Sequence, residues 1–449
     1  MTTTHNTQTW TLNAYHQALS EGWVDASSFY KQHVAKTKEL DEQLHMFASL
    51  EERVIDLQVQ HLKMTKSKGD PLGRLFGVPI AVKDIMDTID FPTCYGSPIH
   101  EGRYSIGDAV VVRRLRDQGA VIYGKTITTE FATMTPAATR NPHNPEHTPG
   151  GSSSGSAAAV AAGVVPVALG TQTNGSVIRP ASFCGVYGFK PSLGELPRSG
   201  MLEQSISLDQ IGIFARNIED LALVGEIMSG DDGEDPACQG KGPRQWLQVA
   251  KSQPPMPPKF CFVRTPWWNR MEPEAQEACD AFVELMEGVV EVVELPSVIE
   301  QTIKWHATVN DAEMLHAYYY EFTNRADALS PLLRQRLEAA QDIKAVDYLL
   351  ARERIPHVAC AFDEFFDRYD AILTPAALGA APKGLNSTGD PIMQTVWTFA
   401  GLPVVGMPLL SAAGGMPLGV QAIGQAQRDG RLLRSCNWLV NTFLERASS

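Results

Sequence analysis

Residues 150–191 read GGSSSGSAAAVAAGVVPVALGTQTNGSVIRPASFCGVYGFKP. Two clusters of small residues, Gly150–Ser156 and Gly170–Ser176, each precede a segment with helix-like or turn-like composition. A serine in a glycine-rich turn at the start of a helix has an exposed hydroxyl, and the first backbone N–H groups of the helix have no partner within it. Because such N–H groups can hold a developing oxyanion, the stretch meets the physical requirements for acyl transfer to a serine nucleophile.

The alternation of short apolar runs with helical patterns continues on the N-terminal side of this stretch. Residues 77–82, 120–123 and 164–169 are strand candidates, and residues 109–118 and 156–163 are helix candidates. Strands that alternate with helices favour one central sheet with helices on both of its faces. The pattern therefore predicts an α/β fold.

The two ends and the middle of the chain have a different texture. Residues 1–70 are largely helical in pattern, with Asp25 as a candidate helix cap, and we expect them to pack on a body formed by residues 71–449. Residues 229–259 are rich in glycine, proline and charge, and a helical pattern follows them. We therefore place a variable helical segment at about 230–365 inside the body.

Composition excludes several classes of protein. The 449 residues carry a net charge of −13 and no run of basic residues, which argues against binding of nucleic acid. The polar N-terminus does not resemble a signal peptide, and the longest apolar run, residues 157–169, is too short to span a membrane. The seven cysteines are odd in number and have no CxxC spacing. We expect a cytoplasmic protein without disulfides, structural zinc or membrane contact.

One motif suggests a different hydrolase. Gly151–Gly155 matches G-x-S-x-G, the nucleophile turn of α/β-hydrolases, which needs a strand directly before it and a catalytic histidine after it. Residues 140–149 are too rich in proline to form that strand, and the later histidines lie in the helical segment. A zinc site at His143 and His147 is also weak, because the two lie in a proline-rich loop. We reject both interpretations.

A serine nucleophile without a histidine needs another base, and Lys83 is the candidate. It ends the apolar run Val78–Val82, and a lysine at the end of a buried strand is desolvated, which favours its neutral form. From this residue alone, a lysine that reaches solvent from a strand end is the more common arrangement.

Several segments together resemble one known family. Gly150–Lys190 resembles the signature of the amidase signature family, and Gly77–Asp84 resembles its lysine strand. The matching segments further along the chain are residues 124–132, 207–212, 373–376, 401–403 and 417–421. The resemblance implies a single domain around a large mixed sheet, and a hydrolase that needs no metal or other cofactor.

The resemblance also assigns catalytic positions. It places the nucleophile at Ser176, a bridging serine at Ser152 after a cis peptide bond with Gly151, and the base at Lys83. It gives Ser153 a supporting hydrogen bond to the lysine. The implied oxyanion hole consists of backbone N–H groups of Thr173, Asn174, Gly175 and Ser176.

Four positions depart from the common family pattern, and one of them is Ser154, which lies where the family usually has glycine. Gln172 replaces an aspartate, Asn174 replaces a glycine, and Arg179 lies three residues after the nucleophile where many members have arginine two residues after it. Asparagine tolerates a positive φ, so the turn can survive, and its side chain can bond a polar group of a substrate. We treat Gln172 and Arg179 as supporting or substrate-binding candidates.

The function that follows from the resemblance is hydrolysis of the linear C–N bond of a small carboxamide through a serine acyl-enzyme. One alternative is the glutaminase subunit of a tRNA-dependent amidotransferase, which would have partner subunits. Another is a hydrolase of ureides such as biuret or guanylurea, which Asn174 motivates. A binding protein without catalysis is the alternative from another class. Homodimers are frequent in the family.

Overall fold

The computed structural model describes residues 10–295, 297–412 and 414–448. Its centre is an 11-stranded mixed sheet. Strand β2 pairs in parallel with β3 and β4, β7 pairs in parallel with β8 and β9, and the other pairs are antiparallel. In sheet order the strands are β1 (Phe47–Ser49), β3 (Val121–Thr126), β2 (Pro79–Lys83), β4 (Val167–Gln172), β6 (Gln210–Ala215), β5 (Tyr187–Lys190), β10 (Val404–Ser411), β11 (Pro417–Ile423), β9 (Ala371–Pro375), β7 (Phe260–Val263) and β8 (Val290–Val293).

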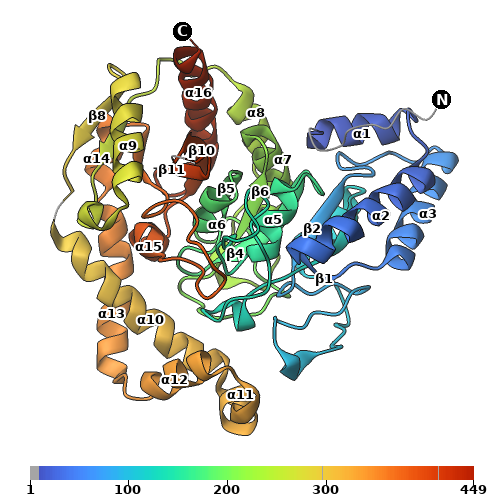
Figure 1. Cartoon of the computed structure of the whole chain (residues 1–449), viewed down its shortest axis with the longest axis horizontal. Coiled ribbons are helices and arrows are strands. Elements are labelled where there is room, and N and C mark those ends of the chain that lie inside the picture. Colours follow the sequence, from blue (N-terminus) through green and yellow to red (C-terminus); the bar gives the residue numbers. More distant parts are fainter. Residues whose placement is uncertain (1–9, 296, 413, 449) are drawn as a thin grey trace.

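Helices cover both faces of the sheet, as the alternation predicts (Figure 1). Neighbouring residues of a strand point to opposite faces. In β6, Gly212 lies against Val177 at the start of α6, whereas the side chain of Ile213 reaches Gly225 of α7. The helices of the body are α4 (Val110–Asp117), α5 (Ser154–Ala161), α6 (Ile178–Phe183), α7 (Ile218–Met228), α15 (Ile392–Phe399) and α16 (Asp429–Ala447).

The N-terminal residues form the predicted helices α1 (Leu12–Ser20), α2 (Ala26–Leu44) and α3 (Glu52–Lys68). Asp25 caps α2, since its carboxylate accepts a hydrogen bond from the backbone N–H of Ser28 at 2.9 Å. Helix α3 ends at Gly69, whose φ of 74° is the left-handed conformation that glycine adopts most easily. These helices lie at the β1 end of the sheet (Figure 1).

The variable segment is not purely helical, which corrects our expectation. It contains strands β7 and β8, which are joined by α9 in a parallel β–α–β unit at the edge of the sheet. β7 is four buried apolar residues directly after a proline-rich loop, too short a run for periodicity to identify. The helices here are α8 (Trp246–Lys251), α9 (Pro273–Leu285), α10 (Gln301–Ala317), α11 (Tyr319–Asn324), α12 (Pro331–Ala340), α13 (Ala345–Cys360) and α14 (Asp363–Arg368).

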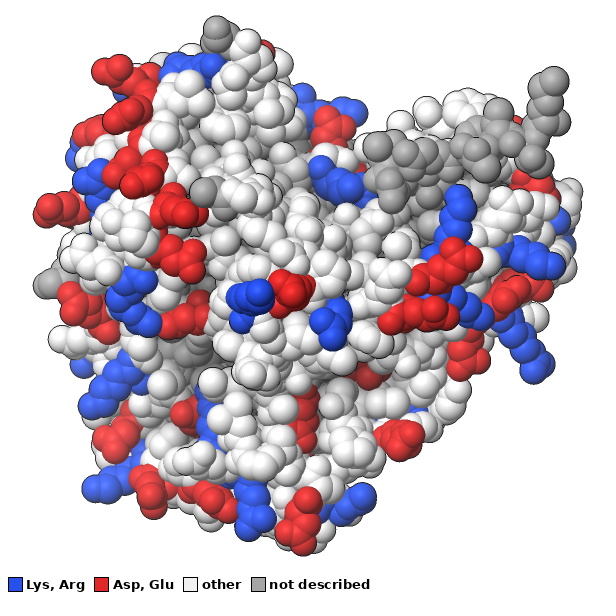
Figure 2. Space-filling model, viewed as in Figure 1, with Lys and Arg blue, Asp and Glu red and all other residues white. Residues whose placement is uncertain are grey.

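Surface charge, helix length and the state of the thiols are the features that bear on the composition-based expectations. On the face that Figure 2 shows, Lys and Arg are interspersed with Asp and Glu rather than gathered in one basic patch. Within the part of the chain that the structure describes, no helix is long and apolar enough to cross a membrane. All seven cysteines are free thiols, and most of them are buried.

Candidate active site

Lys83 is the last residue of β2, and its side chain is completely buried. Its Nζ lies 2.8 Å from Ser152 Oγ and 2.8 Å from Thr171 Oγ1. Strand β2 lies between β3 and β4, so the lysine lies at the end of an interior strand of the sheet rather than on an edge strand at the surface. The alternative from the sequence, a lysine that reaches solvent from the end of a strand, is therefore excluded.

Burial changes the proton affinity of this amine. It lowers the pKa of Lys83 to about 7, because the charged form loses its hydration, while the carboxylate of Asp209 acts in the opposite direction. A large fraction of the amine is then neutral near neutral pH, and a neutral amine next to a hydroxyl can accept its proton.

Ser152 follows a cis peptide bond with Gly151, as the family resemblance implies. The carbonyl oxygen of that peptide accepts a hydrogen bond from Nη2 of Arg179 at 2.7 Å. The Nε of Arg179 donates to the carbonyl oxygen of Thr388 at 2.7 Å. The buried guanidinium thus ties the peptide before Ser152 to the loop that precedes α15.

Ser153 has a different partner from the expected one. Its Oγ lies 3.3 Å from both the backbone nitrogen and the carbonyl oxygen of Thr171, and the lysine is bonded to Ser152 and Thr171 instead. The start of α5 approaches β4 very closely here. A Cβ on Gly170 would lie 2.7 Å from Ser153 Oγ, so only glycine fits.

Ser176 lies in the turn between β4 and α6, and it is partly exposed. Among the described residues, its hydroxyl has no hydrogen-bond partner, and the backbone N–H groups of residues 173–176 have no protein acceptor. The turn therefore presents a hydroxyl and consecutive unpaired donors, which is the arrangement that an oxyanion hole requires.

Gln172 replaces the usual aspartate and has a structural position. Its Oε1 accepts from the backbone N–H groups of Val177 and Ile178 at 2.8 and 3.0 Å, and its Nε2 donates to Thr398 Oγ1 at 2.9 Å. The side chain is completely buried. It caps the first turn of α6 and connects that turn to α15.

Asn174 does not have the positive φ that a glycine at this position would suggest. Its Oδ1 accepts from Thr395 Oγ1 of α15 at 2.8 Å, and the residue is partly exposed. The amide group is therefore held by its oxygen, which leaves Nδ2 as a donor at the site.

A buried carboxylate lies behind the turn. Thr173 Oγ1 donates to Asp209 Oδ1 at 2.5 Å, and Asp209 Oδ2 accepts from the backbone N–H groups of Gln204 and Ser205 at 2.7 and 2.9 Å. Burial raises the pKa of Asp209 to about 6, against these hydrogen bonds. Asp209 connects the turn of residues 173–176, which carries the candidate nucleophile Ser176 and is called the nucleophile turn below, to the segment that precedes β6.

The histidines that suggested zinc bind backbone oxygens. His143 Nε2 lies 3.0 Å from the carbonyl oxygen of Cys184, and His147 Nδ1 lies 2.6 Å from that of Ala381. No group of three or more metal-type side chains occurs among the residues that the structure describes.

Comparison with known families decides the classification. A family model described as Amidase matches residues 30–433. The chain belongs to the Amidase family. It is thus an enzyme of the class that acts on amide C–N bonds, as the signature segments indicate.

Curated relatives and solved structures agree with Amidase membership. A glutamyl-tRNA(Gln) amidotransferase subunit of Agathobacter rectalis is 32% identical over 92% of this chain and 90% of its own length. The corresponding protein of Lachnospira eligens is 31% identical over 93% and 95%. The fold also matches a solved structure described as an unexpected vestigial protein complex that reveals the evolutionary origins of an s-triazine catabolic enzyme. The TM-score is 0.89, and the sequence identity is 28% over 96% of this chain and 98% of the other.

Two of the residues predicted for the site of this Amidase chain are in direct contact, and the structure adds other residues around them. Lys83 contacts Ser152, while Ser176 and Asn174 lie in the turn beyond β4. Sequence reasoning missed Thr171, the second hydrogen-bond partner of Lys83. It also missed the contacts that hold the turn from Asp209, His306 and Thr398. For His306, the sequence offered one signal of a buried polar helix face, which is the regular spacing of polar residues along residues 306–313.

Proposed function

We propose that this chain hydrolyses the linear C–N bond of a small carboxamide through an acyl-enzyme on Ser176, with Ser152 as the proton bridge and Lys83 as the base. The observation that supports it best is the buried Lys83 amine, 2.8 Å from Ser152 Oγ and with a pKa lowered to about 7. A cytoplasmic location and a homodimer remain predictions from the sequence.

Acylation begins with a proton relay. Neutral Lys83 accepts the proton of Ser152, Ser152 accepts the proton of Ser176, and the Ser176 oxygen attacks the amide carbonyl carbon. Backbone N–H groups of residues 173–176 hold the oxyanion of the tetrahedral intermediate, and one such donor is worth about 3–4 kcal/mol in the transition state. The relay then protonates the leaving nitrogen, the C–N bond breaks, and the amine or ammonia departs.

Deacylation uses the same groups in the same order. Water attacks the ester carbonyl of the acyl-enzyme and gives its proton to the relay, and the Ser176 oxygen leaves with that proton. The products are a carboxylic acid and free enzyme. Arg179 keeps the peptide before Ser152 in place throughout, through its bond to the Gly151 carbonyl oxygen.

The direct test is covalent labelling of the full chain with a fluorophosphonate. We expect one label per chain, at Ser176, and expect Ser176→Ala to abolish both labelling and amide hydrolysis. The matched control is Ser156→Ala in the other glycine-serine cluster, whose Oγ donates to the carbonyl oxygen of Leu169 at 2.8 Å. Hydrolysis retained by Ser176→Ala would overturn the proposal, and a chain that neither labels nor turns over would support the binding-protein alternative.

A second candidate is the glutaminase subunit of a tRNA-dependent amidotransferase. It is favoured by the relatives that are named as glutamyl-tRNA(Gln) amidotransferase subunits, which match over more than 90% of this chain. Such a protein would need partner proteins to use the ammonia. Hydrolysis of glutamine by the chain only when it is purified with bound partners would favour this candidate, and hydrolysis of small amides by the isolated chain would contradict it.

The substrate panel should include ureides as well as simple primary amides. The amide of Asn174 is held by Thr395 through its oxygen, so its nitrogen can donate to a second carbonyl of the substrate. If ureides are preferred, we expect Asn174→Gly to reduce kcat/KM for them by about 10-fold, the worth of roughly one hydrogen bond. The same variant should then keep its rate on simple amides.

A further inference from the structure

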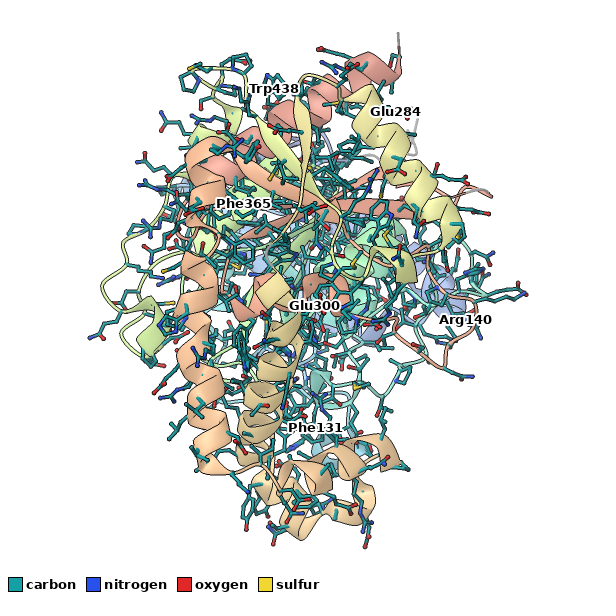
Figure 3. All side chains as sticks on the ribbon, turned by 90° about the vertical axis from the view of Figure 1, so that its left-hand side faces the viewer. Phe131, Arg140, Glu284, Glu300, Phe365 and Trp438 are labelled. Atoms are coloured by element: carbon teal, nitrogen blue, oxygen red, sulfur yellow. The ribbon has the colours of Figure 1, made fainter. Side chains whose placement is uncertain are left out.

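Helix α10, in the variable segment, presents a stripe of buried polar side chains to the catalytic body. His306, Asn310 and Glu313 are 2%, 3% and 7% exposed, and their spacing places them on one face of the helix. Figure 3 shows α10 extending from the labelled Glu300 toward the labelled Phe131. Burial of three polar groups on one helix face requires partners in the element beneath it.

Two members of the stripe hold the segment before β6. Asn310 Oδ1 accepts from Gln204 Nε2 at 3.0 Å. Glu313 accepts from the hydroxyl and backbone N–H of Ser207 at 2.6 and 3.0 Å and from the hydroxyl of Ser205. These contacts dock α10 on the body but do not touch the nucleophile turn.

His306, the third member, reaches the turn itself. Its Nε2 lies 2.9 Å from the carbonyl oxygen of Thr173. A carbonyl oxygen only accepts, so Nε2 carries the hydrogen and donates it. Burial lowers the pKa of His306 to about 4, which keeps the ring neutral in the range where the amine of Lys83 becomes neutral.

The next carbonyl of the turn has a donor of its own. Thr398 Oγ1 donates to the carbonyl oxygen of Asn174 at 2.5 Å, and it accepts from Gln172 Nε2 at 2.9 Å. Helix α15, which carries Thr398, packs beside α10, and the His306 ring lies 6.5 Å from the Phe399 ring. Two neighbouring helices therefore each hold one carbonyl of the nucleophile turn.

The geometry of the peptide bond connects these carbonyls to catalysis. In a trans peptide the C=O and the following N–H point in opposite directions. A donor that fixes the Thr173 carbonyl therefore also fixes the N–H of Asn174, and a donor that fixes the Asn174 carbonyl fixes the N–H of Gly175. Both N–H groups are without a protein acceptor among the described residues.

We propose that His306 and Thr398 are positioning residues that aim the backbone N–H groups of Asn174 and Gly175 at the oxyanion of the tetrahedral intermediate. The inference rests on the proposed acyl-enzyme at Ser176 and adds a role for the variable segment: α10 supplies no reacting atom, and through His306 it orients one of the donors. Interactions that are ready before the reaction stabilise the transition state without reorganisation.

The test compares His306→Leu, which removes the donor, with His306→Gln, whose Nε2 can replace it. Direct loss of an oxyanion donor costs about 10²–10³ in kcat, so loss of its support should cost His306→Leu about 10–100-fold. We expect KM to change less than about 3-fold, since the donors act in the transition state. His306→Gln should recover most of kcat. The rate of fluorophosphonate labelling should fall with kcat, because the phosphonyl oxygen uses the same donors.

The matched control is Asn310→Leu, one helical turn away on the same face. It also removes a buried hydrogen bond of α10, but it leaves the turn untouched, so it should lower the unfolding temperature with kcat within about 3-fold of the parent. The acid limb of the pH profile should stay in place in His306→Leu, since the base is unchanged.

Thr398→Val keeps the proposal testable if His306→Leu does not fold, with Thr398→Ser as its conservative partner. Thr398→Val should also lower kcat rather than raise KM. Folded His306→Leu and Thr398→Val proteins with kcat within about 3-fold of the parent, or an equal loss in Asn310→Leu, would overturn the proposal. Failure of the acyl-enzyme mechanism itself would appear separately, as turnover retained by Ser176→Ala.

Discussion

Lys83, at the end of β2, and Lys190, at the end of β5, are both completely buried, and burial lowers the pKa of each to about 7. Their partners differ. Lys83 is bonded to the hydroxyls of Ser152 and Thr171. Lys190 is bonded to carbonyl oxygens of Gln210, Leu402 and Pro191. A hydroxyl can give up a proton and a carbonyl cannot, so we expect the partners, rather than the pKa, to distinguish the proposed base Lys83 from the structural Lys190.

The largest expected effect is the loss of the base. Lys83→Met should reduce kcat by about 10⁴-fold or more, because the relay then has no proton acceptor. Its free energy of unfolding should stay the same or rise, since an apolar side chain replaces a buried amine. Steady-state kinetics with urea unfolding checks both, and a rate within 10-fold of the parent would remove Lys83 from the mechanism.

The pH profile should identify the same group. The proposed relay needs neutral Lys83, so kcat should rise with pH through an apparent pKa of about 7 and level off above it. About two units below that value only ~1% of the amine is neutral, which predicts a rate about 100-fold under the plateau. The rise of kcat with pH should persist in Lys190→Met. Its disappearance in that variant would mean that Lys190, rather than Lys83, is the titrating base.

Lys190→Met should show the opposite profile to Lys83→Met. The substitution leaves buried carbonyl oxygens of Gln210 and Leu402 without their donor, which costs about 1–3 kcal/mol for each group. We expect a lower unfolding midpoint in urea with kcat within about 3-fold of the parent. A loss of kcat without a loss of stability contradicts this assignment.

The smallest effect concerns the second partner of the base. Thr171→Val removes one hydroxyl from Lys83 and should lower kcat by about 5–10-fold, the worth of roughly 1 kcal/mol. Thr171→Ser keeps the hydroxyl and should retain most of the rate. Equal rates for the two variants would mean that Ser152 alone positions the amine.

Sequence was sufficient to predict structural elements that depend on neighbouring residues in the chain. The strand ending at Lys83 and the turn containing Ser176 are local patterns, and the α/β alternation around them predicted the architecture that the structure confirms. Strands β7 and β8 were not predicted, because runs of only four residues have no readable period, and because β8 is partly exposed whereas β7 is buried.

The supports of the site could not be read in the same way. His306 meets Thr173 across 133 positions of sequence, and Thr398 meets Asn174 across 224. Those pairings depend on how α10 and α15 pack, which no local pattern contains. Ser153 shows the same limit at short range, since its bond to the Thr171 backbone rather than to Lys83 depends on the close approach of α5 to β4.

The position of the β10–β11 hairpin has a consequence for how the protein is made. It lies between β5 and β9, so it joins the half of the sheet formed by β1–β6 to the half formed by β9, β7 and β8. These are the last strands of the chain, and they end at Ile423. A ribosome must therefore finish nearly the whole polypeptide before the two halves can close into one sheet. Thr398 leaves the ribosome only shortly before these strands, so a nascent chain already contains Ser176 long before the turn around this residue has all of its hydrogen-bond partners.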